Sequence, residues 1–167
     1  EIHLRGRAAP GMNEWIRSQT PARWHERVFL HPLVPNEELA SRLVEHDIGF
    51  AGEQNYCRSR ELTVTNKILH YLLGGLAVVA SDTAGQREVA MQAGGAVTLY
   101  ESGNPASLAQ ALRTLLDSPD GLARAKAAAL QTAEQTFSWE RQEPVLLRHI
   151  QEALRETGAM SHTTSHS

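Results

Sequence analysis

The stretch "ELTVTNKILHYLLGGLAVVASD", residues 61–82, decides the fold, because a helical pattern in it passes directly into an apolar strand. The helical part begins at Asn66 and Lys67 and ends at the glycine pair Gly74 and Gly75. Glycines at the end of a helix allow the chain to turn back. A helix that returns into a short, continuous apolar strand is typical of β-α units in a parallel sheet. The stretch therefore predicts an α/β fold.

The rest of the chain repeats this alternation of short apolar runs and helical patterns. The predicted strands are Ile2–Leu4, Val28–His31, Ile48–Ala51, Leu76–Ser81 and Ala96–Tyr100. The predicted helices are Met12–Ser18, Glu37–Glu45, Asn66–Leu73, Gly85–Gln92, Pro105–Leu116, Gly121–Thr136 and Trp139–Glu156. This order predicts a doubly wound parallel sheet with helices trailing after its last strand.

Length and composition restrict the classes of protein to which the chain can belong. A chain of 167 residues suits one domain, which we predict over residues 1–156, and the Ser-, Thr- and His-rich residues 157–167 are predicted to be a disordered tail. The net charge of −3 is mixed along the chain and does not indicate a nucleic-acid partner. No apolar run approaches the roughly 20 residues of a transmembrane segment. The single cysteine, Cys57, cannot form an internal disulfide, which fits a cytoplasmic location.

The cation at the start of the 66–73 helix is the most informative single residue. Asn66 is predicted to cap this helix, so that Lys67 lies in its first turn. A helix start presents free backbone N–H groups and a partial positive charge, so a lysine there costs stability unless an anion lies in front of it. A phosphate site and a solvent-exposed Lys67 without a ligand explain the residues equally well. The turn 81–85 offers further amides at the same edge of the sheet.

The other motifs in the sequence do not predict a functional site. The loop "GRAAPG", residues 6–11, lacks the second glycine of a dinucleotide fingerprint and the lysine of a P-loop, so it is predicted to be an ordinary turn. His25 and His31 lack a third ligand at metal-like spacing, and no metal site is predicted. The tryptophans are predicted to pack in the interior: Trp15, Trp24 and Trp139.

The segment "NKILHYLLGGLAVVASDTAGQREV", residues 66–89, resembles the donor-site segment of family-four glycosyltransferases of the GT-B type, the glycogen-synthase-like retaining enzymes. In that family a helix of the type N-K-apolar-apolar-Glu-Tyr-Leu-x-x-Gly leads into "PVVASD" and a Gly-x-x-Glu turn. "RVFLHPLVPNEELASRLVEHDIGF", residues 27–50, resembles an earlier strand, turn and helix of the same domain, and "FSWE", residues 137–140, resembles its closing segment. The resemblance covers nearly everything from Ile2 to about Leu154.

The resemblance implies a Rossmann-like carboxyl-terminal domain, half of a GT-B fold, that binds a nucleotide-diphosphate sugar as substrate without a separate cofactor. Lys67 would lie against the donor diphosphate, with Asn66 beside it, and His70 would stand where the family has a ribose-binding Glu. The backbone of Leu33 and Val34 would meet the nucleobase. The residues that would border the phosphates or the sugar are Thr83, Ala84, Gly85 and Gln86.

The sequence departs from the family at the carboxylates. The Glu that faces the donor sugar in the family falls at Leu62 here, so Glu61, one residue earlier, and Glu53 are the available substitutes. Lys67 and Glu61 are thus the catalytic candidates.

The resemblance also implies that the chain lacks the first strands of its domain and the amino-terminal acceptor domain, so that alone it would be an inactive fragment of a glycosyltransferase. A non-catalytic module that binds a nucleotide sugar or a partner is the alternative, and a GT-B-fold sugar-nucleotide epimerase is a third possibility.

Overall fold

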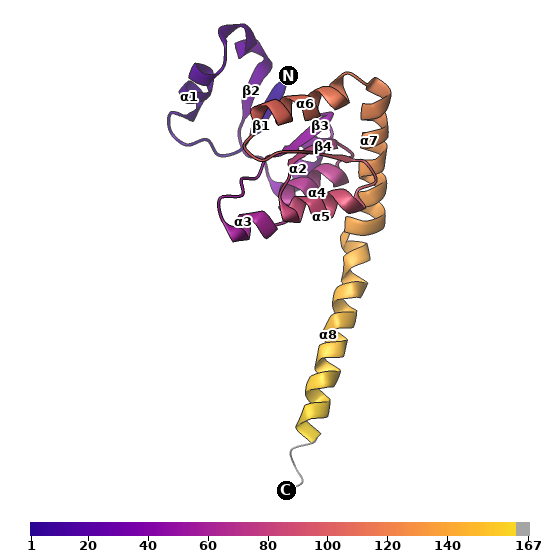
Figure 1. Cartoon of the computed structure of the whole chain (residues 1–167). Coiled ribbons are helices and arrows are strands. Elements are labelled where there is room, and N and C mark those ends of the chain that lie inside the picture. Colours follow the sequence, from indigo (N-terminus) through magenta and orange to yellow (C-terminus); the bar gives the residue numbers. More distant parts are fainter. Residues whose placement is uncertain (163–167) are drawn as a thin grey trace. The chain divides into compact units, whose positions relative to one another are not determined.

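The computed structural model of the chain describes the backbone of residues 1–162 and the side chains of residues 1–155. The chain divides into two compact units, Glu1–Leu39 and Ala40–Ser167, which we call unit 1 and unit 2 and describe separately. Figure 1 labels most of their helices and strands. Among the described residues, no helix combines the length and the apolar character that crossing a membrane requires.

Unit 1 is a single β-α-β element. Strands β1 (Ile2–Arg5) and β2 (Val28–His31) pair in parallel, with Ile2 opposite Val28. Helix α1 (Met12–Gln19) and a 3₁₀ helix, η1 (Ala22–Arg27), connect them. Both strands and α1 agree with the sequence prediction to within one residue at each end, whereas η1 was not predicted.

Unit 2 contains a parallel sheet of three strands in the order β3-β4-β5. These are β3 (Ile48–Ala51), β4 (Ala77–Ser81) and β5 (Val97–Tyr100). All five residues of the central strand β4 are buried. The fold class is therefore α/β, as predicted, but the described strands form two sheets, of two and three strands, where the sequence predicts one. The alternation of strands and helices does not encode which strands pair.

Helices cover both faces of the three-stranded sheet. The helices that contact it are α4 (Asn66–Leu73), α5 (Ala84–Gln92), α6 (Pro105–Leu116) and α7 (Pro119–Thr132). Two more helices precede α4, namely α2 (Asn36–Leu43) and α3 (Arg58–Leu62). Of these, α2 spans the boundary between the two units. Helix α7 continues as a π-helical segment, η2 (Ala133–Phe137), and then as α8 (Trp139–His162). Helix α3 was not predicted.

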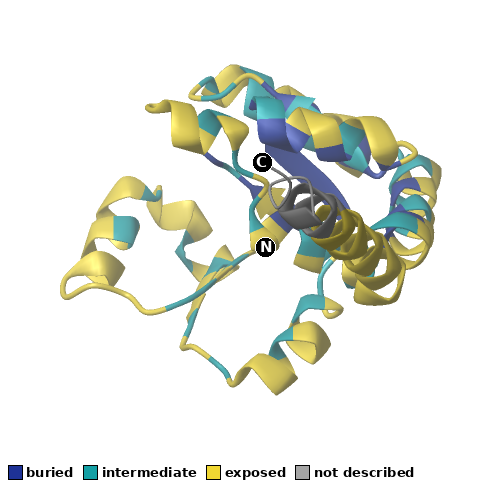
Figure 2. Cartoon of the chain, turned by 90° about the horizontal axis from the view of Figure 1, so that it is seen from below, coloured by how far each residue is buried: buried dark blue, intermediate teal, exposed yellow. Residues whose placement is uncertain are grey.

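The alternation of side chains along β4 divides the core into two layers. On one face, Val78 packs with Ile68 of α4 and Val89 of α5, and on the other Val79 packs with Leu115 of α6. Successive residues of a strand point to opposite faces of its sheet, so a β4 that is buried along its whole length needs helices on both faces. Figure 2 shows the buried residues of unit 2 gathered in the sheet and on the helix surfaces that face it.

The carboxyl-terminal helices differ from the prediction in two respects. The helix expected over residues 121–136 begins at Pro119, after a Ser118 side chain that accepts a hydrogen bond from Gly121 N. Helix α8 continues past Glu156, its predicted end, to His162, so the first residues of the predicted tail are helical. The rest of that predicted tail, residues 163–167, lies outside the described residues.

The tryptophan prediction is wrong. The exposed fractions of Trp15, Trp24 and Trp139 are 59%, 46% and 62%. Each lies on or beside a helix that has few buried residues of its own, so apolar neighbours in the sequence did not mean burial. Arg27 lies over the ring of Trp24, with 5.8 Å between the guanidinium carbon and the ring centroid.

Candidate functional site

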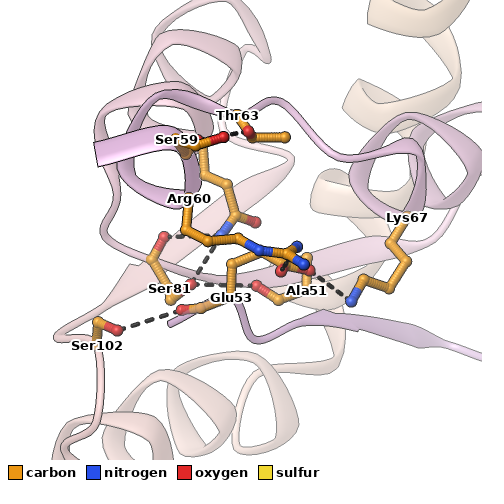
Figure 3. A network of polar contacts seen from close by, with 9 residues as sticks. Ala51, Glu53, Ser59, Arg60, Thr63, Lys67, Ser81 and Ser102 are labelled. Atoms are coloured by element: carbon orange, nitrogen blue, oxygen red, sulfur yellow. Dashed lines mark hydrogen bonds and ion pairs between the residues drawn. The ribbon is translucent and has the colours of Figure 1, made fainter. Parts of the chain in front are cut away.

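The carboxyl ends of the three parallel strands of unit 2 place polar residues at one edge of the sheet. Ser81 ends β4 and donates a hydrogen bond of 3.4 Å from Oγ to the carbonyl oxygen of Ala51, which ends β3. Ser102, after β5, donates a 3.2 Å hydrogen bond to the carbonyl oxygen of Glu53. Figure 3 shows these contacts. Open α/β sheets bind their ligands outside this edge.

Glu53 is a buried carboxylate with two cations beside it. Its side chain is 10% exposed, Nζ of Lys67 lies 2.5 Å from Oε1, and a terminal guanidinium nitrogen of Arg60 lies 3.6 Å from Oε2. Within the described residues, Oε1 accepts no aligned hydrogen bond, so its contact with Lys67 is an ion pair without hydrogen-bond geometry. We call Glu53, Arg60 and Lys67 the charge cluster.

The charge cluster explains why a lysine is tolerated at the start of α4. A cation at a helix start is disfavoured unless an anion lies in front of it, and in this structure the chain supplies that anion as Glu53. The side chain of Lys67 is still 54% exposed, so the ammonium group keeps an open side toward solvent.

The predicted cap of α4 is wrong by one residue. The helix begins at Asn66, and the cap position falls on Thr65, whose backbone is extended and whose side chain makes no capping hydrogen bond. Asn66 is therefore the first helical residue, and its exposed side chain does not cap the helix.

Two groups near the charge cluster have shifted pKa values. A hydrogen bond that Arg60 donates to Tyr56 raises the pKa of Arg60 above its ordinary value, and the charges of Tyr56 and Glu53 raise it further, so Arg60 stays charged. Burial raises the pKa of Tyr100 above its ordinary value; a hydrogen bond with Ser81 lowers it and the charge of Glu53 raises it. The phenol of Tyr100, at the end of β5, is therefore neutral at pH 7.

The turn between β4 and α5 is held by internal hydrogen bonds. Thr83 caps α5, with its Oγ1 accepting from Gln86 N at 3.4 Å. The side-chain amide of Gln86 donates to the Oγ of Ser81 at 2.7 Å and to its carbonyl oxygen at 3.2 Å. Thr83, Gly85 and Gln86 are buried, whereas Ala84 is half-buried. The side chains of Thr83 and Gln86 thus order the turn.

The side chain of Glu61, a residue of α3, contacts the first residue of α5. Its Oε1 accepts a 2.9 Å hydrogen bond from the backbone N–H of Ala84, so a carboxylate of the chain already occupies this helix start. Gly85 allows this close packing, because a Cβ there would lie 2.5 Å from the carbonyl oxygen of Thr63 and 2.7 Å from that of Leu62. Of the two candidate carboxylates, Glu61 thus holds α5, and Glu53 lies between the cations.

The structure brings some of the predicted donor-binding residues together. Lys67 and His70 are three residues apart on α4, a spacing that places them on neighbouring parts of the helix surface, and both are exposed. Leu33, 58% exposed, and Val34 follow β2 in unit 1. Within the described residues, no group of three or more His, Cys, Asp or Glu side chains could hold a metal ion.

Sequence reasoning missed Arg60 and left Glu53 as a secondary candidate. Arg60 lies in a helix of five residues, which is too short to show apolar periodicity. The position of Glu53 did contain a signal, because it comes two residues after a strand of the parallel sheet, at the edge where such sheets bind ligands.

The sequence of this chain matches a known protein family. Residues 2–118, from β1 through α6, match the family described as glycosyl transferases group 1. The chain belongs to the group 1 glycosyl transferases. A search of curated proteins found no match to this group 1 glycosyl transferase.

Solved structures similar to this group 1 glycosyl transferase share its fold. HepE of Anabaena in complex with UDP superposes with a TM-score of 0.69 at 19% identity, covering 92% of this chain and 40% of HepE. HepE in complex with UDP and glucose superposes with a TM-score of 0.65 at 19% identity, with the same coverage of both chains. Sucrose-phosphate synthase of Thermosynechococcus elongatus superposes with a TM-score of 0.68 at 16% identity, covering 90% of this chain and 38% of the synthase. The chain thus has the Rossmann-like fold of half a GT-B enzyme and spans about two fifths of these proteins.

The exposure of His70 gives a first prediction. In this group 1 glycosyl transferase, His70→Glu places no charge in the core, because His70 is exposed on α4. The new carboxylate lies in the last turn of the helix, where the dipole disfavours it by roughly 0.3–1 kcal/mol. We expect thermal melts to show a decrease of a few degrees at most. A loss as large as that of a buried charge would place His70 in the core and remove it from the donor-binding residues.

Proposed function

We propose that this chain is the donor-binding part of a cytoplasmic, retaining family-four glycosyltransferase that transfers a sugar from a nucleotide-diphosphate sugar to an acceptor. The observation that carries the proposal is the position of Lys67 in a chain of this family. Its half-exposed ammonium group lies at the start of α4, beside the carboxyl edge of the parallel sheet. This combination of a cation, free helix amides and a sheet edge favours a phosphate group as ligand.

The proposed mechanism follows from the charge that develops during transfer. As the bond between the sugar and the diphosphate breaks, negative charge grows on the leaving diphosphate. Lys67 and the first N–H groups of α4 stabilise that charge, and they act most strongly in the transition state. In a retaining reaction the acceptor hydroxyl attacks from the side of the leaving group. We propose no metal and no separate cofactor, and an amino-terminal acceptor domain as the partner that completes the site.

The other contacts belong to the same proposal. His70 hydrogen-bonds the ribose through its ring nitrogens. Glu61 is the candidate catalytic carboxylate. This role requires it to leave the Ala84 amide that it now caps. The residues that border the phosphates or the sugar are Asn66, Lys67, Thr83, Ala84, Gly85 and Gln86.

Binding of a nucleoside diphosphate tests the proposal. UDP is the probe, because HepE, which has the same fold, was solved in complex with it. We expect the chain to bind UDP with a Kd on the order of 1 mM, and uridine more weakly because it lacks the phosphates. Titrations followed by NMR chemical shifts suit this affinity range. Unchanged amide shifts for α4 at saturating UDP would overturn the proposal.

Two observations favour a non-catalytic binding module as the second candidate. Glu61 is engaged with the start of α5, and His70 stands where the resemblance implies a Glu, so the paired carboxylates of the family are altered. Such a module binds UDP as well, so binding does not separate the two candidates. Assays of sugar release and transfer with the intact protein separate them, because the module binds the donor and leaves it unchanged.

A further inference from the structure

Two cations from different helices converge on one carboxylate. Arg60 comes from α3 and Lys67 from α4, and both reach Glu53, as Figure 3 shows. Two cations held this close repel each other unless an anion lies between them. Glu53 therefore makes their proximity possible.

The three side chains of the charge cluster differ in exposure, so that the cluster presents its cations to solvent. The side chain of Glu53 is 10% exposed, whereas those of Arg60 and Lys67 are 49% and 54% exposed. The carboxylate lies behind the cations, so an anion that approaches from solvent meets the cations first. Two positive groups and one negative group leave the cluster with a net positive charge.

The two cations suit the two ends of a diphosphate. A guanidinium group presents paired N–H donors that match two phosphate oxygens, and an ammonium group acts as a compact point charge. Arg60, like any arginine, is charged at all relevant pH values, and Tyr56 and Glu53 raise its pKa further. A diphosphate offers each cation its own phosphoryl group.

We propose that Arg60 is a second cationic contact for the diphosphate of the donor, and that Glu53 is the positioning residue that holds Arg60 beside Lys67. This inference rests on the proposed function, and it assigns a further binding residue to the same site. It gives the chain two phosphate-binding cations within residues 60–67.

The test compares Arg60 with another arginine on the same helix. We expect Arg60→Gln to weaken binding of inorganic pyrophosphate and of UDP about tenfold, the loss of one charge-assisted contact, and to leave uridine binding unchanged. Arg58→Gln removes the same charge from an exposed position on α3 and is expected to leave all three affinities near those of the wild type. The affinities are measured on the whole chain by NMR titration at fixed ionic strength.

A double-mutant cycle tests the role of Glu53. If Glu53 holds Arg60 in place, Arg60→Gln costs about tenfold in pyrophosphate affinity when Glu53 is present and about twofold in the Glu53→Gln background. Arg60→Lys keeps the charge without the guanidinium fork and is expected to give an intermediate affinity. Equal losses in both backgrounds would overturn the positioning role.

The outcomes separate this inference from the proposed function. If the wild-type chain binds neither UDP nor pyrophosphate, both fail. If it binds both ligands and Lys67→Met weakens binding while Arg60→Gln behaves like Arg58→Gln, only the assignment of Arg60 fails.

Discussion

Replacing Lys67 with methionine is expected to lower the proposed sugar transfer by the intact protein about a hundredfold, and to destabilise the chain as well. The loss of transfer follows because a fixed charge on the leaving diphosphate contributes most in the transition state. The loss of stability follows from Glu53, because among the described residues its buried carboxylate then keeps Arg60 alone as a partner, at 3.6 Å. Leaving such a group without a close partner costs about 1–3 kcal/mol. Initial rates at saturating donor and thermal melts measure the two effects.

Three further variants test this explanation of the stability loss. Glu53→Gln is expected to be nearly neutral, since it leaves a half-exposed lysine that water can solvate. The double variant Lys67→Met with Glu53→Gln is expected to recover most of the lost stability, because no buried charge remains. Lys126→Met is the matched control: it breaks a 2.7 Å pair with Asp47, whose side chain is 70% exposed, and should change stability little.

The combination of results decides the role of Lys67. Reduced stability with rates close to those of the wild type would make Lys67 a structural cation and would remove it from the catalytic candidates. Reduced rates in a variant whose stability is restored by Glu53→Gln would separate the two roles and support the proposed function.

Replacing Gly85 with alanine is expected to lower the stability of the chain by about 1–3 kcal/mol. The added Cβ would lie 2.5 Å from the carbonyl oxygen of Thr63 and 2.7 Å from that of Leu62, and a backbone carbonyl cannot rotate away as a flexible side chain can. Either α5 or residues 62–63 must shift. Thermal melts measure the loss, and NMR amide shifts of residues 58–67 show which segment moves.

The control for Gly85 is Gly6→Ala. A Cβ at Gly6 meets no atom within 4 Å, and Gly6 is not among the glycines with positive φ, so this substitution should leave the melting temperature nearly unchanged. If Gly85→Ala melts like the wild type with unchanged shifts over residues 58–67, the segment is not packed tightly against α5.

The sequence predicted most elements because hydrophobic pattern and stop signals agree. The bounds of α4 and β3 were predicted to the residue, and β4 to within one. Helix α3 was missed because five residues do not complete two helical turns. The division into two sheets was missed because strand pairing depends on contacts between distant segments, which a local pattern does not contain.

The candidate site was predictable to a smaller extent. The sequence located Lys67 at the start of a helix, because that depends on local signals. Its pairing with Glu53 depends on how the loop between β3 and α4 folds back over the sheet edge, and no spacing rule gives that. The capping of α5 by Glu61 was missed for the same reason, since Glu61 and Ala84 lie 23 positions apart.

The hydrogen bond between Glu61 and Ala84 links two features that could otherwise change independently. Glu61 and Arg60 are adjacent residues of α3, so the segment that carries a cation of the charge cluster also carries the cap of α5. If this segment moves away from the sheet edge, the first turn of α5 loses its carboxylate and its Ala84 amide becomes free in the same event. Displacement of Arg60 and exposure of the Ala84 amide are thus coupled. An anion that binds at the start of α5 must replace Glu61 there, and it therefore competes with the ordered position of α3.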